Sequence, residues 1–179
     1  AATYGDGSLG FSDAAGLVPG LRPLNMYGYS KQLFDLWLLR EHLQSEVASL
    51  KFFNVYGPNE YHKGSMQSVV AKAHRQIRTE GRLCLFKSDV PGLAHGEQKR
   101  DFVYVKDCAV FMAWLLDRRD VCGIRNVGTG TARSFNDLGR AVFRALGSPC
   151  RLEYVDMPPG LSGRYQNYTR ADMSWLNAV

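Results

Sequence analysis

The spacing of apolar and polar residues changes several times along this chain, and each change marks an expected element. Residues 5–25 are rich in Gly, Pro, Ser and Asp, which is typical of a loop. From Met26 to Ser45 the apolar positions recur at helical spacing and predict a long helix. One stripe of this helix is expected to face the core and consists of Leu33, Phe34, Trp37 and Leu38.

The remainder of the chain alternates short apolar runs with helical patterns. The runs that predict strands are VASLKFFNV, RLCLF, RDFVYV, GIRNV and RLEYVDMP. Helices are expected over residues 65–79, 106–119, 134–147 and 169–176. Ser134 and Thr169 are the expected N-caps of the last two helices, and Gly81 is expected to close the first. Strands that alternate with helices predict an α/β layered fold.

Composition narrows the possible partners. The chain has 179 residues, about the size of one domain. Its net charge is +5, but the basic residues are scattered and form no stripe interleaved with aromatics. We therefore expect no nucleic-acid partner, although a phosphate-bearing small molecule needs only a few cations. No apolar run approaches the length of a membrane span, so no membrane partner is expected. The four cysteines and four histidines lack metal-ligand spacing, and a reducing cytoplasm is the default location.

A tyrosine and a lysine form the first candidate for chemistry. The segment NMYGYSK places Tyr27 four residues before Lys31, so both lie on one face of the predicted helix. An ammonium group beside a phenol favours the phenolate, and such a tyrosine can accept or return the proton of an alcohol. On spacing alone, a surface lysine one turn from a half-buried tyrosine is the more common explanation. The neighbouring segments decide between the two.

Five segments in order, AATYG, NMYGYSK, FFNVYGP, RDFVYVKD and NVGTG, resemble the extended short-chain dehydrogenase/reductase family, the nucleotide-sugar epimerases and dehydratases. The resemblance implies an α/β fold in which this chain forms the C-terminal part of a Rossmann-type doubly wound parallel sheet with a smaller α/β substrate domain. The implied domains are discontinuous. Residues 1–55 and 113–134 would belong to the nucleotide-binding domain, and residues 56–112 and 135–179 to the substrate-binding domain.

Longer segments narrow the resemblance to one branch of that family. FFNVYGPNEYHKGSM, LFKS, KRDFVYV, NVGTGTARSFNDL and GRYQNYT resemble the enzymes that invert C6 of the heptose in an ADP-activated sugar. The resemblance implies an isomerase with an ADP-heptose substrate, a bound NADP (or NAD), and a homo-oligomeric full-length protein in lipopolysaccharide biosynthesis in the cytoplasm. Two alternatives stay open: a UDP- or dTDP-sugar epimerase or dehydratase of the same family, and a non-catalytic binding or assembly fragment.

The resemblance also implies a role for individual residues. Tyr27 and Lys63 would be the two acid/base groups, Lys31 would hold the nicotinamide ribose, and Val55 would lie beside the nicotinamide, so these four would bind the cofactor. Arg100 offers a planar fork of donors suited to the diphosphate. The full set expected to contact the substrate is Asn54, Ser65, Lys72, Phe86, Lys87, Ser88, Arg100 and Tyr165.

The chain also departs from the family. The N-terminal βαβ unit with its glycine-rich loop is not expected here, and the catalytic Ser or Thr of the family would stand just before Ala1. Lys72 stands where family members often have a histidine. Gly128 and Gly130 of NVGTG are expected in a tight turn rather than in a phosphate loop. We therefore expect residues 1–179 to be the C-terminal part of a longer enzyme.

Overall fold

Helices and strands alternate along the chain in the computed structural model, which describes residues 1–161 and 165–178. The helices are α1 (Met26–Arg40), α2 (Val69–Glu80), α3 (Val105–Leu116) and α4 (Phe135–Ala145). The strands are β1 (Ala48–Phe52), β2 (Asn54–Tyr56), β3 (Leu83–Phe86), β4 (Lys99–Tyr104), β5 (Gly123–Val127), β6 (Ala132–Ser134) and β7 (Leu152–Val155). Within the described part of the chain, none of the helices has the length and apolar character that crossing a membrane requires.

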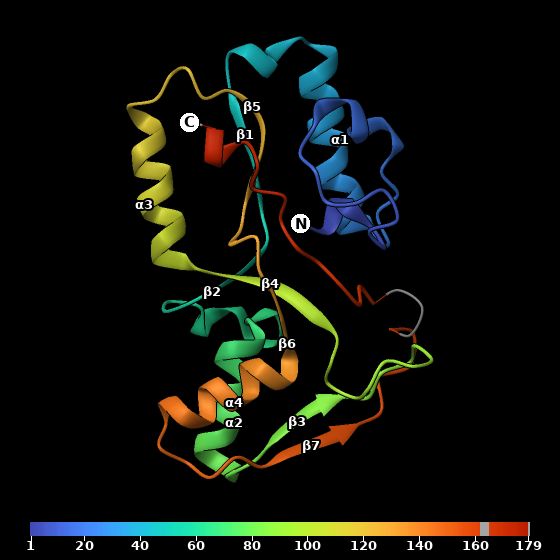
Figure 1. The fold of residues 1–179 in the computed structure, drawn as a ribbon, viewed down its shortest axis with the longest axis vertical. Coiled ribbons are helices and arrows are strands. Elements are labelled where there is room, and N and C mark those ends of the chain that lie inside the picture. Colours follow the sequence, from blue (N-terminus) through green and yellow to red (C-terminus); the bar gives the residue numbers. More distant parts are fainter. Residues whose placement is uncertain (162–164, 179) are drawn as a thin grey trace.

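The strands form small sheets in which parallel pairing dominates. β1 pairs with β5, β2 with β4, and β3 with β7, all in parallel, while β6 joins β4 in the antiparallel sense. Figure 1 shows α1 and α3 on opposite sides of β1 and β5. The predicted α/β class is therefore confirmed.

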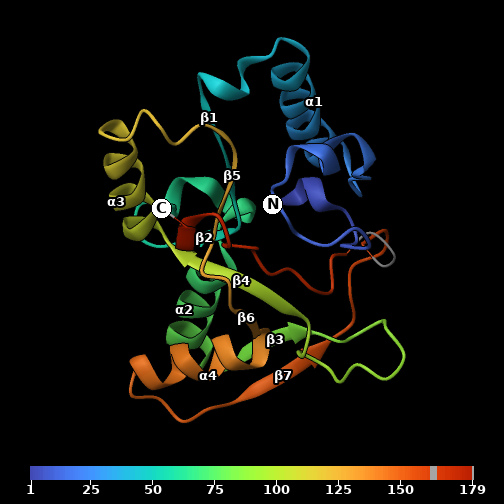
Figure 2. The same ribbon diagram turned by 45° about the horizontal axis from the view of Figure 1, so that its top comes forward.

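The molecule has two halves that β4 connects, as Figures 1 and 2 both show. One half holds α1, α3, β1 and β5, and the other holds α2, α4, β3 and β7. A buried apolar cluster fills the second half and consists of Ala73, Ile77, Leu83, Leu85, Phe135, Leu138 and Phe143. The proposed division into two discontinuous domains stays a prediction.

The predicted stripe of α1 was wrong. Of its four apolar residues only Leu38 is buried, and Leu33, Phe34 and Trp37 are 64%, 54% and 43% exposed. The helix buries polar Gln32 and Asp35 instead. The Gln32 side-chain amide donates to the carbonyls of Val18 and Leu21, so α1 is held to the preceding segment by hydrogen bonds that an apolar pattern cannot show.

Helix ends were predicted unevenly. The side chain of Ser134 caps α4 in a complete capping box with Asp137, as its sequence indicates. α2 begins at Val69 rather than at residue 65, because residues Tyr61–Met66 form a separate 3₁₀-helix.

The helix expected after Thr169 was wrong. The Thr169 N–H donates to the Lys99 carbonyl in an extended bridge, and a short helical turn follows only at Leu176–Ala178. The start of this segment therefore bonds to β4, and backbone bonds within the segment begin only with Leu176 N–H to the Met173 carbonyl.

Candidate functional site

Tyr27 and Lys31 lie together on the exposed side of α1. The Lys31 ammonium sits over the Tyr27 ring, with Nζ 5.5 Å from the ring centroid. Both side chains line a cavity of about 810 Å³ together with segment 1–3 and strand β1. We call this the α1 cavity. The cavity is open to solvent, and the Lys31 ammonium in its lining could donate hydrogen bonds to the hydroxyl groups of a sugar or ribose.

Gly28, between the two tyrosines of NMYGYSK, sets how closely α1 approaches the N-terminal segment. Its N–H donates to the Asn25 side chain, 2.9 Å away, which caps the helix. A Cβ atom at this position would lie 2.8 Å from the Ala2 carbonyl oxygen and 2.7 Å from Cβ of Pro23. Glycine therefore allows the close contact that places Tyr27 beside residues 1–3.

A buried ion pair lies among the residues that line the α1 cavity. Lys51 and Asp35 are only 6% and 3% exposed, and the Lys51 ammonium donates to the Asp35 carboxylate. Lys51 also donates to Thr3 Oγ1 at 3.2 Å, and Ser49 Oγ donates to Asp35 at 3.1 Å. This cluster was not predicted from the sequence. Its signal was a lysine between the apolar Leu50 and Phe52 of β1, and an aspartate one turn after Lys31.

Arg100, Phe86 and Tyr165, three of the residues expected to contact the substrate, lie together in the structure. The Arg100 side chain lies 4.9 Å from the centroid of Tyr165 and 5.6 Å from that of Phe135, and Phe86 meets Tyr165 edge-on. Arg100 is 5% exposed, and within residues 1–161 and 165–178 it makes no ion pair. Burial lowers its pKa, because the guanidinium loses hydration that no carboxylate replaces. A buried cation without an acid is suited to bind an anion.

Val55 and Lys63 line a second cavity of about 320 Å³, beside the start of α3. The Glu60 carboxylate fixes this loop, because it accepts hydrogen bonds of 2.6 Å from both N–H and Oγ of Ser68. The Lys63 N–H donates to the Glu60 carbonyl at 3.1 Å. Burial opposes ionisation of Glu60, but the hydrogen bonds from Ser68 outweigh it and hold its pKa below the ordinary value.

The other predicted substrate residues are dispersed. Asn54, Ser65 and Lys72 are exposed and line neither of the two cavities. Lys87 makes an ion pair of 2.9 Å with Asp156, and the Ser88 N–H donates to Nδ1 of His95. The remaining candidates fall into three groups: the α1 cavity, the Lys63 loop and the Arg100 cluster. That these groups act on one substrate stays a prediction.

One motif escaped the sequence analysis. Residues 5–10, GDGSLG, match the spacing G-x-G-x-x-G. A dinucleotide fingerprint requires a strand before the glycines and a helix at their end. Here a 3₁₀-helix, Ala2–Tyr4, precedes them and no α-helix begins before Met26. The three glycines have φ values of 58°, 85° and 77° and serve an irregular turn, so this match does not bind a dinucleotide in the usual way.

Family comparison gives these sites a context. The model of the NAD dependent epimerase/dehydratase family matches residues 1–128, and the chain belongs to this family. It is 60% identical to the ADP-L-glycero-D-manno-heptose-6-epimerase of Nitratidesulfovibrio vulgaris (strain DP4), over 98% of this chain and 54% of the relative. It is 45% identical to the Fusobacterium nucleatum protein of the same name, over 100% of this chain and 57% of that one. The chain thus spans about half the length of the curated relatives it matches.

Solved structures agree in fold. The Helicobacter pylori ADP-L-glycero-D-manno-heptose-6-epimerase superposes with a TM-score of 0.75 at 28% identity, over 97% of this chain and 48% of that one. The Thermus thermophilus UDP-glucose 4-epimerase in complex with NAD gives a TM-score of 0.72 at 27% identity, over 99% and 54% of the two chains. Both neighbours are nucleotide-sugar epimerases, and the predicted resemblance to that family is confirmed.

Proposed function

We propose that this chain is part of an isomerase that inverts C6 of the heptose in ADP-D-glycero-D-manno-heptose. The observation that carries the proposal is the match of 98% of the chain, at 60% identity, to a relative named for that reaction. The buried and acid-free Arg100 supports it, because an ADP-sugar carries a diphosphate that needs such a cation. Phe86 and Tyr165 flank this arginine and would pack on the rest of the ligand.

The cofactor would be NADP or NAD. When bound, its nicotinamide would supply the hydride chemistry by which a secondary alcohol becomes a ketone and returns. Lys31 would hold the ribose hydroxyls through its exposed ammonium, and Val55 would give the ring an apolar neighbour. The cation and the open volume of the α1 cavity fit a ribose, so the residues present are compatible with this part of the group.

Two side chains would handle the hydroxyl proton. One of them, Tyr27, would take the hydroxyl proton as the carbon is oxidised, and the other, Lys63, would give a proton to the same oxygen after the sugar has turned its opposite face. The Lys31 ammonium lies over the Tyr27 ring and would accompany it at the site of proton transfer. Glu60 would hold the loop of Lys63 in place through its bonds to Ser68.

Replacing Tyr27 by Phe in the full-length enzyme tests the central role. We expect kcat for ADP-heptose epimerisation to fall about 1,000-fold, the usual size of a lost acid/base group, with ADP-sugar affinity nearly unchanged. Tyr29→Phe, two residues along the same helix, is the matched control and should keep normal turnover. Near-normal turnover of Tyr27→Phe would remove Tyr27 from the mechanism. A screen of UDP- and dTDP-sugars against ADP-heptose checks the substrate class separately.

We also propose a homo-oligomeric, cytoplasmic full-length protein whose product feeds lipopolysaccharide synthesis. Its relatives' names support a place in sugar-nucleotide metabolism. If residues outside 1–179 hold most of the cofactor, the chain 1–179 alone should bind NADP or NAD weakly. Quenching of intrinsic tryptophan fluorescence measures this, and submicromolar binding would contradict the expectation.

A further inference from the structure

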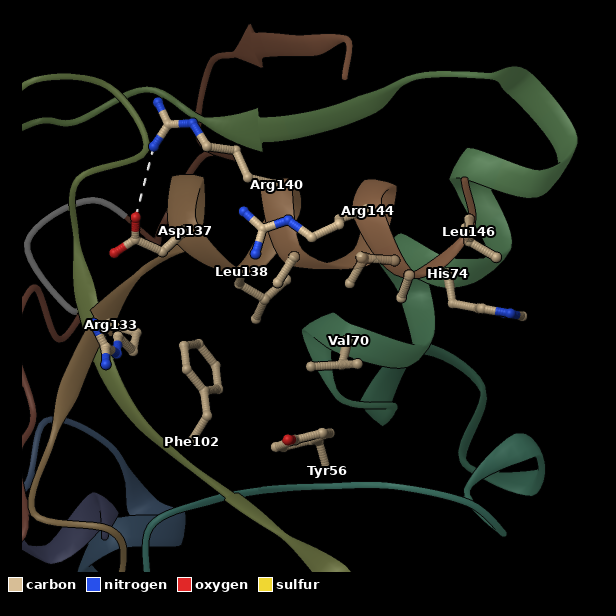
Figure 3. A pocket seen from close by; sticks show the side chains of 13 residues that line it. Tyr56, Val70, His74, Phe102, Arg133, Asp137, Leu138, Arg140, Arg144 and Leu146 are labelled. Carbon is tan, nitrogen blue, oxygen red and sulfur yellow. Dashed lines mark ion pairs between the residues drawn. The ribbon is translucent and has the colours of Figure 1, made fainter. Parts of the chain in front are cut away.

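A groove in the second half of the molecule adjoins two of the candidate groups: Tyr56 lines both this groove and the Lys63 cavity, and Arg133 of the groove is the strand partner of Arg100. It has a volume of about 840 Å³ and runs between α2 and α4, beside β2, β4 and β6 (Figure 3). We call it the α2–α4 groove. Its apolar lining comes from Tyr56, Val70, Phe102, Leu138, Val142 and Leu146. Several of these side chains also pack against the buried cluster beneath, so the floor of the groove has fixed support.

The rim of the groove is basic. Arg133, Arg140, Arg144 and His74 line it, and Asp137 is its one carboxylate. Asp137 is already engaged, because it pairs with Arg140 at 3.6 Å and accepts a hydrogen bond from the Ser134 N–H. Within the part of the chain that the structure describes, Arg133 and Arg144 make no ion pair. An apolar floor under unpaired cations is complementary to an apolar segment that carries acids.

The spread of the arginines favours an extended ligand over a compact one. Arg140 and Arg144 are one turn apart on α4, roughly 6 Å along its axis. Arg133 lies in β6, before the helix, so the three arginines are spread over two elements. A single phosphate or carboxylate could reach only part of this set. A helix with acids one turn apart repeats at the same interval, and exposed Ala141 and Ala145 leave room for its backbone.

We propose that the α2–α4 groove binds an acidic amphipathic helix of a partner protein, with the apolar face of that helix on the groove floor and its carboxylates on Arg133, Arg140 and Arg144. This is the helix-in-groove mode of recognition. None of Tyr27, Lys31, Lys63 or Arg100 lines the groove. The proposal therefore does not depend on the proposed epimerase activity, and the groove adjoins the Arg100 cluster through Arg133.

A synthetic probe tests the proposal directly. A fluorescein-labelled helical peptide of about 18 residues, roughly 27 Å long, would carry Leu on one face and Glu one turn apart along its edges. Fluorescence anisotropy with residues 1–179 should show binding at least about tenfold tighter than that of the same peptide with Gln for Glu. Raising the salt from about 50 mM to about 500 mM should weaken the binding, since exposed charges are screened.

Variants locate the binding. Arg133→Gln with Arg144→Gln should weaken the Glu peptide about tenfold, and Ala141→Trp should block it by filling the groove. Arg75→Gln, an exposed arginine of α2 outside the groove, is the charge-matched control and should have no effect. Circular dichroism melting of each variant shows whether it is folded, and the arginine double variant keeps the test valid if Ala141→Trp is not.

Four results would overturn the proposal. They are equal binding of the Glu and Gln peptides, no measurable binding of either, unchanged binding by the Arg133/Arg144 double variant, and displacement of the peptide by ADP, which would make the groove part of the substrate site. Sedimentation velocity adds a fifth: self-association of residues 1–179 that Ala141→Trp abolishes would assign the groove to a second copy.

Discussion

Arg100 and Asp101 are adjacent, buried and charged, but they differ in how far hydrogen bonds compensate their burial. Asp101 is completely buried, and its carboxylate accepts hydrogen bonds from the N–H groups of Thr129, Gly130 and Ala171 and from the Thr129 hydroxyl, at 2.7–3.0 Å. The NVGTG turn therefore directs its N–H groups at a carboxylate of the protein itself. The chain bends at Gly128 and Gly130, and its N–H groups are taken up by Asp101, as in a segment that does not serve as a phosphate loop.

Replacing Asp101 by Asn should destabilise the fold. An amide presents an NH₂ group to donors that now meet a carboxylate, and a buried unsatisfied donor costs about 1–3 kcal/mol. We expect the free energy of unfolding in urea to fall by about 3 kcal/mol. Asp117→Asn, exposed at the end of α3, is the control and should change it by less than about 0.5 kcal/mol. Equal midpoints for both variants would contradict the anchoring role of Asp101.

Removing the charge of Arg100 should stabilise the fold and weaken ligand binding. Among the described residues no acid forms an ion pair with its buried charge, so Arg100→Met should raise the free energy of unfolding by about 1 kcal/mol, through removal of an uncompensated desolvation cost. If Arg100 binds the diphosphate as proposed, the same change should weaken ADP binding at least tenfold, since Arg100 would supply a bidentate phosphate contact. Urea unfolding and calorimetric titration with ADP measure the two effects. Loss of stability together with unchanged ADP affinity would make Arg100 a structural residue.

Elements with local signals were predicted well, and elements held by distant polar contacts were not. The N-cap of α4 at Ser134 and the glycine that ends α2 are local signals, and both are observed. The prediction of a core-facing stripe on α1 was wrong because we inferred the buried face from the apolar residues alone. Here Asp35 and Gln32 face inward instead, because their partners come from other segments.

The Ser68 side chain makes a contact between the loop of Lys63 and α2 that a double-mutant cycle can test. Ser68 caps α2 by accepting from the Ala71 N–H, and it also donates to Glu60. Ser68→Ala should cost about 1–2 kcal/mol. In a double-mutant cycle with Glu60→Gln we expect a coupling energy above about 0.5 kcal/mol. Ser134→Ala removes the cap of α4 and is the control, so its effect should be additive with that of Glu60→Gln. If the effects of Ser68→Ala and Glu60→Gln are also additive, Ser68 does not couple the loop to α2 through Glu60.

The same carboxylate predicts an acid dependence. The folded-state pKa of Glu60 lies below its ordinary value of 4.5. Its ionised form therefore contributes stability above that value, and the contribution is lost as the pH falls through the folded-state pKa. Glu60→Gln removes this dependence, so the stability gap between the wild type and the variant should narrow between about pH 6 and about pH 3. A constant gap in urea unfolding across that range would contradict the assignment.

At the scale of the whole molecule, polar clusters join segments that are far apart in the sequence. The Asn126 side chain accepts from the Tyr4 hydroxyl and donates to the carbonyls of Phe11 and Asp172, so it connects the N-terminal segment, β5 and the C-terminal segment. Burial raises the pKa of Tyr4, which keeps its hydroxyl protonated as the donor. The family resemblance identified the candidate site residues one by one. Their separation into distinct groups depends on such long-range contacts, which spacing along the chain cannot reveal.

The Asp35–Lys51 ion pair is one of these long-range polar contacts. It joins α1, β1 and the segment of Thr3 beside Tyr27. Asp35→Asn or Lys51→Met alone leaves a buried charge unpaired and should cost about 3–5 kcal/mol. The double variant Asp35→Leu/Lys51→Met leaves no unpaired charge and should recover most of that loss. Urea unfolding of the three proteins measures it, with Arg40→Gln in the exposed Arg40–Glu41 pair as a control that changes little. If the double variant loses the sum of the two single losses, the two charges do not act as a pair, and α1 must be held by its other contacts.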